Sequence, residues 1–101
     1  MKHRHKFNAK RTELDGIKFD SKKEANYYRH LKLRVSSGEV VFFLRQIPFY
    51  LPGGVVYRVD FQEFHADGTV HFVDVKGMET QEFKAKKKIV EQLYPVEIEI
   101  Y

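Results

Sequence analysis

Two runs of alternating apolar and polar residues, joined by a short polar turn, most constrain what this chain can fold into. The first run is VVYRVDFQEF (55–64) and the second is TVHFVDVK (69–76). Both have the period of two that is typical of a β-strand. The segment HADG (65–68) between them contains a turn-forming Asp-Gly pair. The pattern therefore predicts a β-hairpin.

The length of the hairpin loop decides whether two carboxylates in these strands meet. A two-residue loop places Asp60 and Asp74 on opposite faces of the sheet. A three-residue loop, with Gly68 in the left-handed conformation, pairs His65 with Thr69 and so sets Asp60 opposite Asp74. The sequence leaves both loops open, and only the second allows the two acids to act together.

The segments on either side of the hairpin predict an α+β domain. Residues 16–21 have the pattern of a short strand, residues 21–38 that of an amphipathic helix ending at Gly38, and residues 39–51 that of a strand interrupted by Pro48. After the hairpin we expect a helix from about Thr80 to Tyr94 and a last strand in VEIEIY (96–101). The predicted order is β-α-β-β-β-α-β, a mixed sheet flanked by two helices. The second helix should direct four apolar side chains to the core: Phe83, Ile89, Val90 and Leu93.

Basic charge is concentrated in the first third of the chain. Residues 1–34 contain 11 Lys and Arg and 4 Asp and Glu, whereas residues 35–101 contain 7 and 10. A clustered basic segment is typical of nucleic-acid binders, although a solvated surface explains it equally well. We expect a basic N-terminal arm over residues 1–15, followed by one domain over residues 16–101. His3 and His5 fit a solvated arm better than a metal site.

Composition excludes several classes of protein. The chain has no Cys, which excludes disulfides, thiolate zinc sites and cysteine nucleophiles. No apolar run reaches the roughly 18 residues of a membrane span, and the basic start lacks the apolar core of a signal peptide. We therefore expect a soluble, intracellular protein. At 101 residues, a partner subunit often helps stability, so a homodimer is expected as well.

Three acids and one lysine are candidates for chemistry. Asp74 and Lys76 share one face of their strand, and Asp60 joins them if the loop has three residues. Glu24 lies on the apolar stripe of the first helix, although Ser21 and Glu24 also fit a capping box, which gives Glu24 a purely structural role. Converging carboxylates suit Mg²⁺ or Mn²⁺. Such a site, with Lys76 beside it, predicts phosphodiester hydrolysis.

These residues resemble a known superfamily. A helical Glu24, Asp60 in RVDF and the Asp-x-Lys of VDVKG, followed by a helix, are similar to the PD-(D/E)XK nucleases. More narrowly, KFNAKRTELDGIKFDSKKEA and VDVKGMETQEFKAKKKI resemble a group of small phage-encoded proteins in that superfamily. The resemblance covers nearly the whole chain.

The resemblance implies a restriction-endonuclease-like core and metal-dependent cleavage of DNA, with branched or junction DNA as a possible substrate, in the cytoplasm of an infected bacterial host. It assigns Asp60, Asp74 and Glu24 to the metal and Lys76 to catalysis. Gln46 matches a polar position near the site in some relatives. The main alternative is a nucleic-acid-binding module that keeps the fold without turnover. The residues expected to contact nucleic acid are Lys6, Lys10, Arg11, Gln46, Lys84, Lys87 and Lys88.

Overall fold

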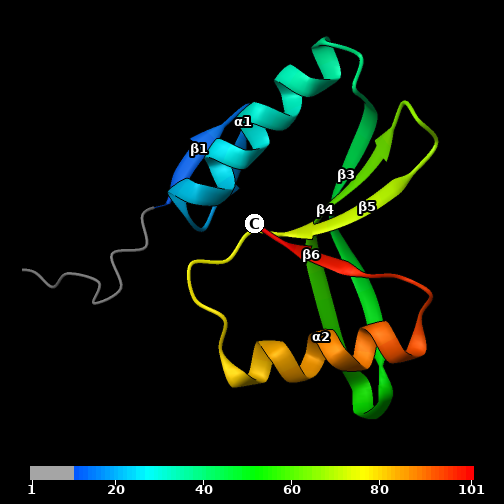
Figure 1. Cartoon of the computed structure of the whole chain (residues 1–101). Coiled ribbons are helices and arrows are strands. Elements are labelled where there is room, and N and C mark those ends of the chain that lie inside the picture. Colours follow the sequence, from blue (N-terminus) through cyan, green and yellow to red (C-terminus); the bar gives the residue numbers. More distant parts are fainter. Residues whose placement is uncertain (1–10) are drawn as a thin grey trace, which may run out of the picture.

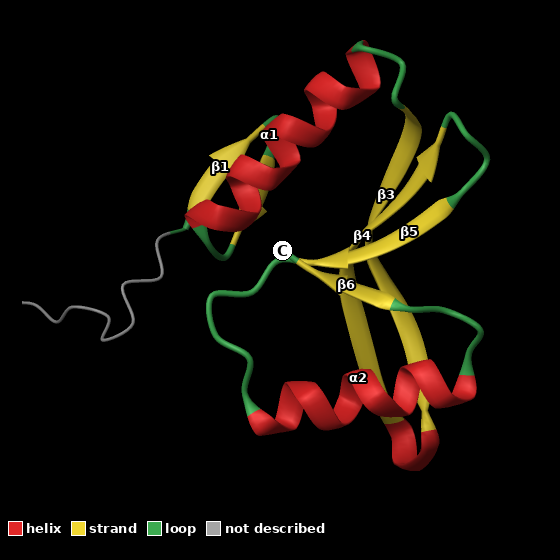
Figure 2. Ribbon diagram, in the orientation of Figure 1, coloured by secondary structure: helices red, strands yellow, loops and turns green. Residues whose placement is uncertain are grey.

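The computed structural model describes residues 11–101 and has an α+β architecture with two α-helices and a mixed four-stranded sheet (Figures 1 and 2). Residues 1–10, which include Lys6 and Lys10, lie outside the described part. The main sheet has the order β3-β4-β5-β6. In chain order the elements are β1 (Thr12–Leu14), β2 (Ile17–Phe19), α1 (Lys22–Ser36), β3 (Val40–Leu51), the 3₁₀ turn η1 (Pro52–Gly54), β4 (Val55–His65), β5 (Val70–Asp74), α2 (Gln81–Leu93) and β6 (Ile98–Ile100).

A small hairpin precedes α1, and here the expected arm is wrong in part. β1 pairs antiparallel with β2 across the turn residues Asp15 and Gly16, both of which have positive φ. Asp15 accepts hydrogen bonds from the Tyr28 hydroxyl (2.8 Å) and from Lys32 Nζ (2.6 Å). Residues 12–15 are therefore tied to α1 rather than forming part of an arm, and the element order gains a strand at its start.

The first helix begins as its sequence predicts. The Ser21 hydroxyl accepts a hydrogen bond from the N–H of Glu24 (3.1 Å), which caps the helix N-terminus. The apolar stripe of α1 buries Ala25, Tyr28 and Leu31. These side chains form a core cluster with strand residues, among them Phe61, and this packing fixes α1 against the sheet.

The hairpin between β4 and β5 has the three-residue loop. The N–H of His65 donates to the carbonyl of Thr69 (2.9 Å), and Gly68 has a φ of +90°. The two strands pair antiparallel from Phe64 opposite Val70 to Phe61 opposite Val73. Continued by one residue, this register sets Asp60 opposite Asp74.

The second helix packs on a separate core cluster. Thr80 caps its N-terminus by accepting from the N–H of Phe83 (3.1 Å), and Phe83 and Val90 are buried. Ile89 and Leu93, which we expected in the core, are 38% and 54% exposed. The expectation was wrong because the face of α2 that packs on the sheet runs from Phe83 past the half-buried Lys86 and Lys87 to Val90, which leaves Ile89 and Leu93 beside it and exposed.

The long β3–β4 ribbon carries both helices, with α1 beside one half and α2 beside the other (Figure 1). Along β4, Tyr57 and Val59 belong to the α2 cluster, whereas Phe61 belongs to the α1 cluster. Asp60 therefore lies where the two halves of the core meet. Among residues 11–101, no helix is long and apolar enough to cross a membrane.

Candidate functional site

The two strand carboxylates lie where β4 and β5 stop pairing through their backbones. The N–H of Asp60 donates to Oδ1 of Asp74 (2.9 Å), and the N–H of Val75 donates to Oδ2 of Asp60 (2.9 Å). Each side chain thus replaces a backbone acceptor at the point where the ladder ends. The arrangement brings both carboxylates to one place and holds each in a fixed orientation.

Asp74 is almost fully buried, with 1% of its surface exposed. Its Oδ2 accepts a hydrogen bond from the Tyr57 hydroxyl, which reaches it from β4. A buried carboxylate is costly unless hydrogen-bond donors surround it, and here a backbone amide and a phenol supply them. Tyr57 is thus a neighbour of the site that sequence reasoning missed; its position three residues before Asp60 is the only sequence signal for it.

Glu24 reaches the same region from the first turn of α1. Its Oε2 accepts from Gln46 Nε2 at 3.4 Å and lies 3.7 Å from the guanidinium of Arg45. Since the carboxylate is directed to β3 rather than back to the helix start, Ser21 and Glu24 do not act as a reciprocal capping box. The Glu24 side chain thus contacts β3, and Ser21 caps the helix without it.

Gln46 connects the helical acid to the strand acids. Its Nε2 also donates to Oδ1 of Asp60 (3.2 Å), so one amide touches carboxylates from α1 and β4. Gln46 has a φ of +54°, a left-handed conformation in the middle of β3 that is unfavourable for a residue with a Cβ. Such strain persists where surrounding contacts impose it and is common at functional sites.

The clustered negative charge changes the protonation of the acids. Burial, together with the negative charges of Asp74 and Glu24, raises the pKa of Asp60 to about 7, although the N–H of Val75 acts against this. Burial also raises the pKa of Glu24, while Arg45 opposes the rise. The site therefore holds more carboxylates than its own cations neutralise, which is the condition that favours a bound cation.

Lys76 follows the end of β5 rather than lying within it. Its backbone N–H donates to the carbonyl of Tyr101 (3.3 Å), which extends the parallel contact between β5 and β6. Its Nζ lies 4.5 Å from the centroid of the Phe83 ring on α2. The lysine side chain is therefore on the α2 side of the sheet, the side to which Tyr57 and Asp74 also belong.

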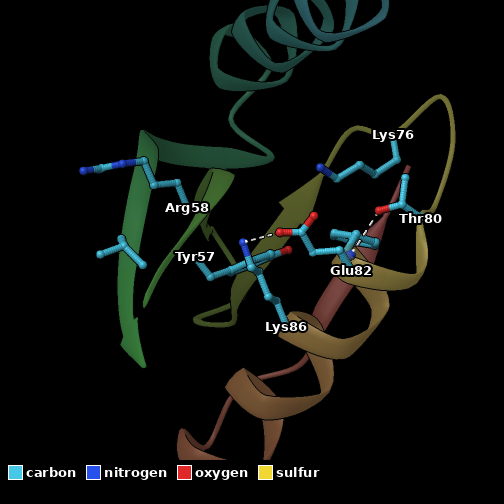
Figure 3. Close-up of a pocket in the computed structure, with 8 residues that line it drawn as sticks. Tyr57, Arg58, Lys76, Thr80, Glu82 and Lys86 are labelled. Carbon is cyan, nitrogen blue, oxygen red and sulfur yellow. Dashed lines mark hydrogen bonds and ion pairs between the residues drawn. The ribbon is translucent and has the colours of Figure 1, made fainter. Parts of the chain in front are cut away.

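A pocket of about 270 Å³ opens next to these residues, between β4, the segment after β5, and the first turns of α2 (Figure 3). Its lining includes Tyr57, Arg58, Lys76, Thr80 and Lys86. Sequence reasoning missed Arg58 and Lys86 as site residues. Lys86 lies three residues after the buried Phe83, but Lys87 at four residues shares the same side of the helix, so spacing alone does not select Lys86.

In the described part of the chain, the other basic residues that we expected to contact nucleic acid do not line this pocket. Lys84, Lys87 and Lys88 are on α2 but outside the lining of this pocket, and Lys87 pairs with Glu91 at 3.1 Å. Arg11 is exposed at the start of the described chain. The structure brings together Glu24, Gln46, Asp60, Asp74 and Lys76, and leaves these four basic residues apart from them.

The donor set suits a hard divalent cation that is held only in part by protein. Among residues 11–101, no three His, Asp or Glu side chains are arranged as a ready metal site. An ionised carboxylate has about four lone-pair positions, so Asp60 and Asp74 can accept more than their present hydrogen bonds. Mg²⁺ is typically bound by one or two carboxylates, water and substrate phosphates. The oxygen ligands of Asp60 and Asp74 therefore fit such an ion.

Comparison with known proteins gives a family but no activity. No curated protein and no solved structure matches the chain significantly. Residues 4–100 match the family model described as "Protein of unknown function (DUF1064)". Since this match covers nearly all 101 residues, the chain belongs to the DUF1064 family.

Proposed function

We propose that this protein is a divalent-metal-dependent DNA endonuclease that hydrolyses phosphodiester bonds. The observation that carries the proposal is the convergence of Asp60, Asp74 and Glu24, from two strands and one helix, within one hydrogen-bonded cluster. Acids so far apart in sequence do not converge in a buried site without a cost from charge repulsion. A bound cation offsets that cost.

Asp60 and Asp74 would hold the ion, with Glu24 supporting them through Gln46. When bound, Mg²⁺ or Mn²⁺ supplies a Lewis acid for the phosphoryl oxygen and lowers the pKa of a bound water. Lys76 is placed to neutralise charge that develops on the phosphate, since its ammonium faces the open pocket. Gln46 keeps the two acids from separating. Ionised Asp60 is needed for this role, so binding of the ion should weaken as pH falls below the pKa of about 7 that Asp60 has in the metal-free protein.

DNA is the substrate that the charge distribution favours. The net charge of +4 and the basic residues Lys6, Lys10 and Arg11 near the start of the chain would attract a phosphate backbone. The resemblance to PD-(D/E)XK nucleases adds a restriction-endonuclease-like core and points to branched or junction DNA in phage DNA metabolism. Lys84 and Lys88 stay in this proposal as outer contacts to the backbone. A homodimer would supply two centres for two strands, and sedimentation analysis tests it.

A non-catalytic nucleic-acid-binding module is the second candidate. One observation favours it: both oxygens of Asp60 and of Asp74 already accept hydrogen bonds from the protein. Under this reading the acids close the end of the β4–β5 ladder and hold no ion. The two candidates differ in metal binding and in turnover.

The deciding experiment measures cleavage of supercoiled plasmid and of a synthetic four-way junction with Mg²⁺, Mn²⁺ or EDTA. Wild type is compared with Asp74→Asn, which keeps the size of the buried side chain, and with Lys76→Ala. Lys18→Ala removes the same charge from β2, away from the site, and serves as the matched control. Circular dichroism verifies that each variant is folded.

We expect metal-dependent cutting by wild type and Lys18→Ala, and its loss in Asp74→Asn and Lys76→Ala. Binding of Mn²⁺, measured by calorimetry, should be lost in Asp74→Asn as well. Wild-type protein that binds these DNAs but cuts neither with any metal would establish the binding module instead. Cutting that persists in both site variants would place the active centre elsewhere.

A further inference from the structure

The pocket beside the acids is lined mainly by cationic side chains, a property that the carboxylate cluster does not explain. At about 270 Å³ it is smaller than the roughly 300–1,000 Å³ typical of pockets for drug-sized ligands. Its lining carries three cations, Arg58, Lys76 and Lys86, against the single carboxylate of Glu82. A small anionic group is the ligand that such a site favours.

Only part of this positive charge is neutralised within the protein. Lys86 pairs with Glu82, one turn earlier on α2, at 3.2 Å (Figure 3). Within residues 11–101, neither Arg58 nor Lys76 forms an ion pair. Figure 3 shows Lys76 reaching over the pocket, while Arg58 extends outward from the strand on the opposite side. The lining therefore keeps a net positive charge, with Lys76 and Lys86 at the pocket and the guanidinium of Arg58 directed away from it in the absence of a ligand.

The pocket and the acid cluster share a wall. The ring of Tyr57 lines the pocket while its hydroxyl bonds to Asp74, and Lys76 lines the same pocket two residues after that acid. A phosphate group in the pocket would therefore lie directly next to a phosphate held at the carboxylates. Adjacent anionic groups at a fixed short spacing are a property of a nucleic-acid strand and not of a single free phosphate.

We propose that the pocket between β4 and the first turns of α2 binds a backbone phosphate of the DNA strand, adjacent to the phosphate that is hydrolysed. This inference rests on the proposed function for the identity of the strand. Lys86 is its specific ligand and Lys76 is shared between the two phosphates, while Arg58, whose side chain points outward from β4, turns in to the phosphate when DNA binds. Lys86 leaves Glu82 for the phosphate when DNA binds, at little cost, because Glu82 is largely exposed.

The test separates binding from cleavage. Fluorescence anisotropy measures the affinity of a labelled duplex in EDTA over a series of salt concentrations, for wild type, Arg58→Ala and Lys86→Ala. The control is Lys32→Ala, which also removes a lysine that forms an ion pair. Lys32 pairs with Asp15 beside α1, which lies apart from α2 (Figure 1). Each phosphate contact contributes roughly 0.7–0.9 to the slope of log K against log salt.

We expect Arg58→Ala and Lys86→Ala each to weaken binding and to reduce that slope by roughly 0.7–0.9, with no change for Lys32→Ala. Unchanged slopes in both pocket variants would overturn the pocket assignment, even if wild type cuts DNA. An equal reduction in Lys32→Ala would also overturn it, since the effect would then be one of general charge.

Two further outcomes separate this inference from the function on which it rests. If wild type never cuts, but its slope depends on Arg58 and Lys86, the nuclease fails and the phosphate pocket stands. Inorganic phosphate at matched ionic strength provides the last comparison. If it raises the melting temperature in a way that depends on Lys86 and is as effective as the duplex, the pocket is a site for free phosphate and the backbone assignment is wrong.

Discussion

The raised pKa of Asp60 makes the stability of the protein depend on pH in a direction opposite to that of an ordinary salt-bridged acid. Its pKa rises from an ordinary value of 3.8 to about 7, mainly through burial. Between these values the folded state binds a proton that the unfolded state has released. The free energy of unfolding therefore falls as pH rises through this window, and the loss is complete above about pH 7.

The size of this effect follows from the same shift. Each pH unit of difference corresponds to about 1.36 kcal/mol, which gives an upper limit of about 4 kcal/mol. Asp60 is half-buried, so solvent screening reduces the expected effect to about 2 kcal/mol. The variant Asp60→Asn removes the titration, while its amide oxygen can still accept from the N–H of Val75.

Urea denaturation of wild type and Asp60→Asn, in EDTA, measures this effect at about pH 4 and about pH 8. The stability of the variant relative to wild type should increase by about 2 kcal/mol between the two pH values. Comparing the two proteins at each pH cancels the titration of groups that both share. A difference that is independent of pH, or one that changes in favour of wild type, would refute the reasoning that burial keeps Asp60 protonated.

Three further predictions follow from individual contacts. Tyr57→Phe removes the donor to the buried Asp74 and should cost about 1–3 kcal/mol in urea denaturation; unchanged stability would mean that the hydroxyl is dispensable. Leu31→Ala, at a fully buried position, should cost about 2–5 kcal/mol, whereas Leu33→Ala, 63% exposed on the same helix, should change stability by less than about 0.5 kcal/mol. Mn²⁺ at 100 times its dissociation constant should stabilise wild type by about 2.7 kcal/mol at about pH 8 but leave Asp60→Asn unchanged, and equal stabilisation of both would place the ion elsewhere.

Local sequence signals predicted most of the elements. The Ser21 and Thr80 caps begin the two helices where their patterns start. The missed element, the β1–β2 hairpin, had a signal as well, since the Asp15-Gly16 pair is flanked by alternating residues. The high density of basic residues in that region suggested an unstructured arm instead. Pairing with β2 and the contacts of Asp15 to α1 outweigh that charge.

The candidate site was only partly predictable. The sequence alone identified Glu24, Asp60, Asp74 and Lys76 as candidate site residues that could act together. The lysines of α2 were harder to assign, because four of them lie close together in sequence. Only the orientation of the helix brings Lys86 to the pocket. The orientation depends on which apolar residues are buried, and burial of Phe83 and Val90 without Ile89 or Leu93 could not be seen from periodicity.

By itself, the sequence determined the two helices, the long strands, the basic excess and the set of acids that could act together, because propensity, capping and periodicity are local properties of the chain. Only the tertiary structure decided whether these acids meet. Two hairpin loops were compatible with the same residues, and a shift of one residue reverses the face of every side chain in a strand. The three-residue loop, the left-handed Gln46 and the packing of α1 on Phe61 together place Asp60, Asp74 and Glu24 in one cluster. That choice depends on contacts between residues distant in sequence, and no local sequence pattern predicts such contacts.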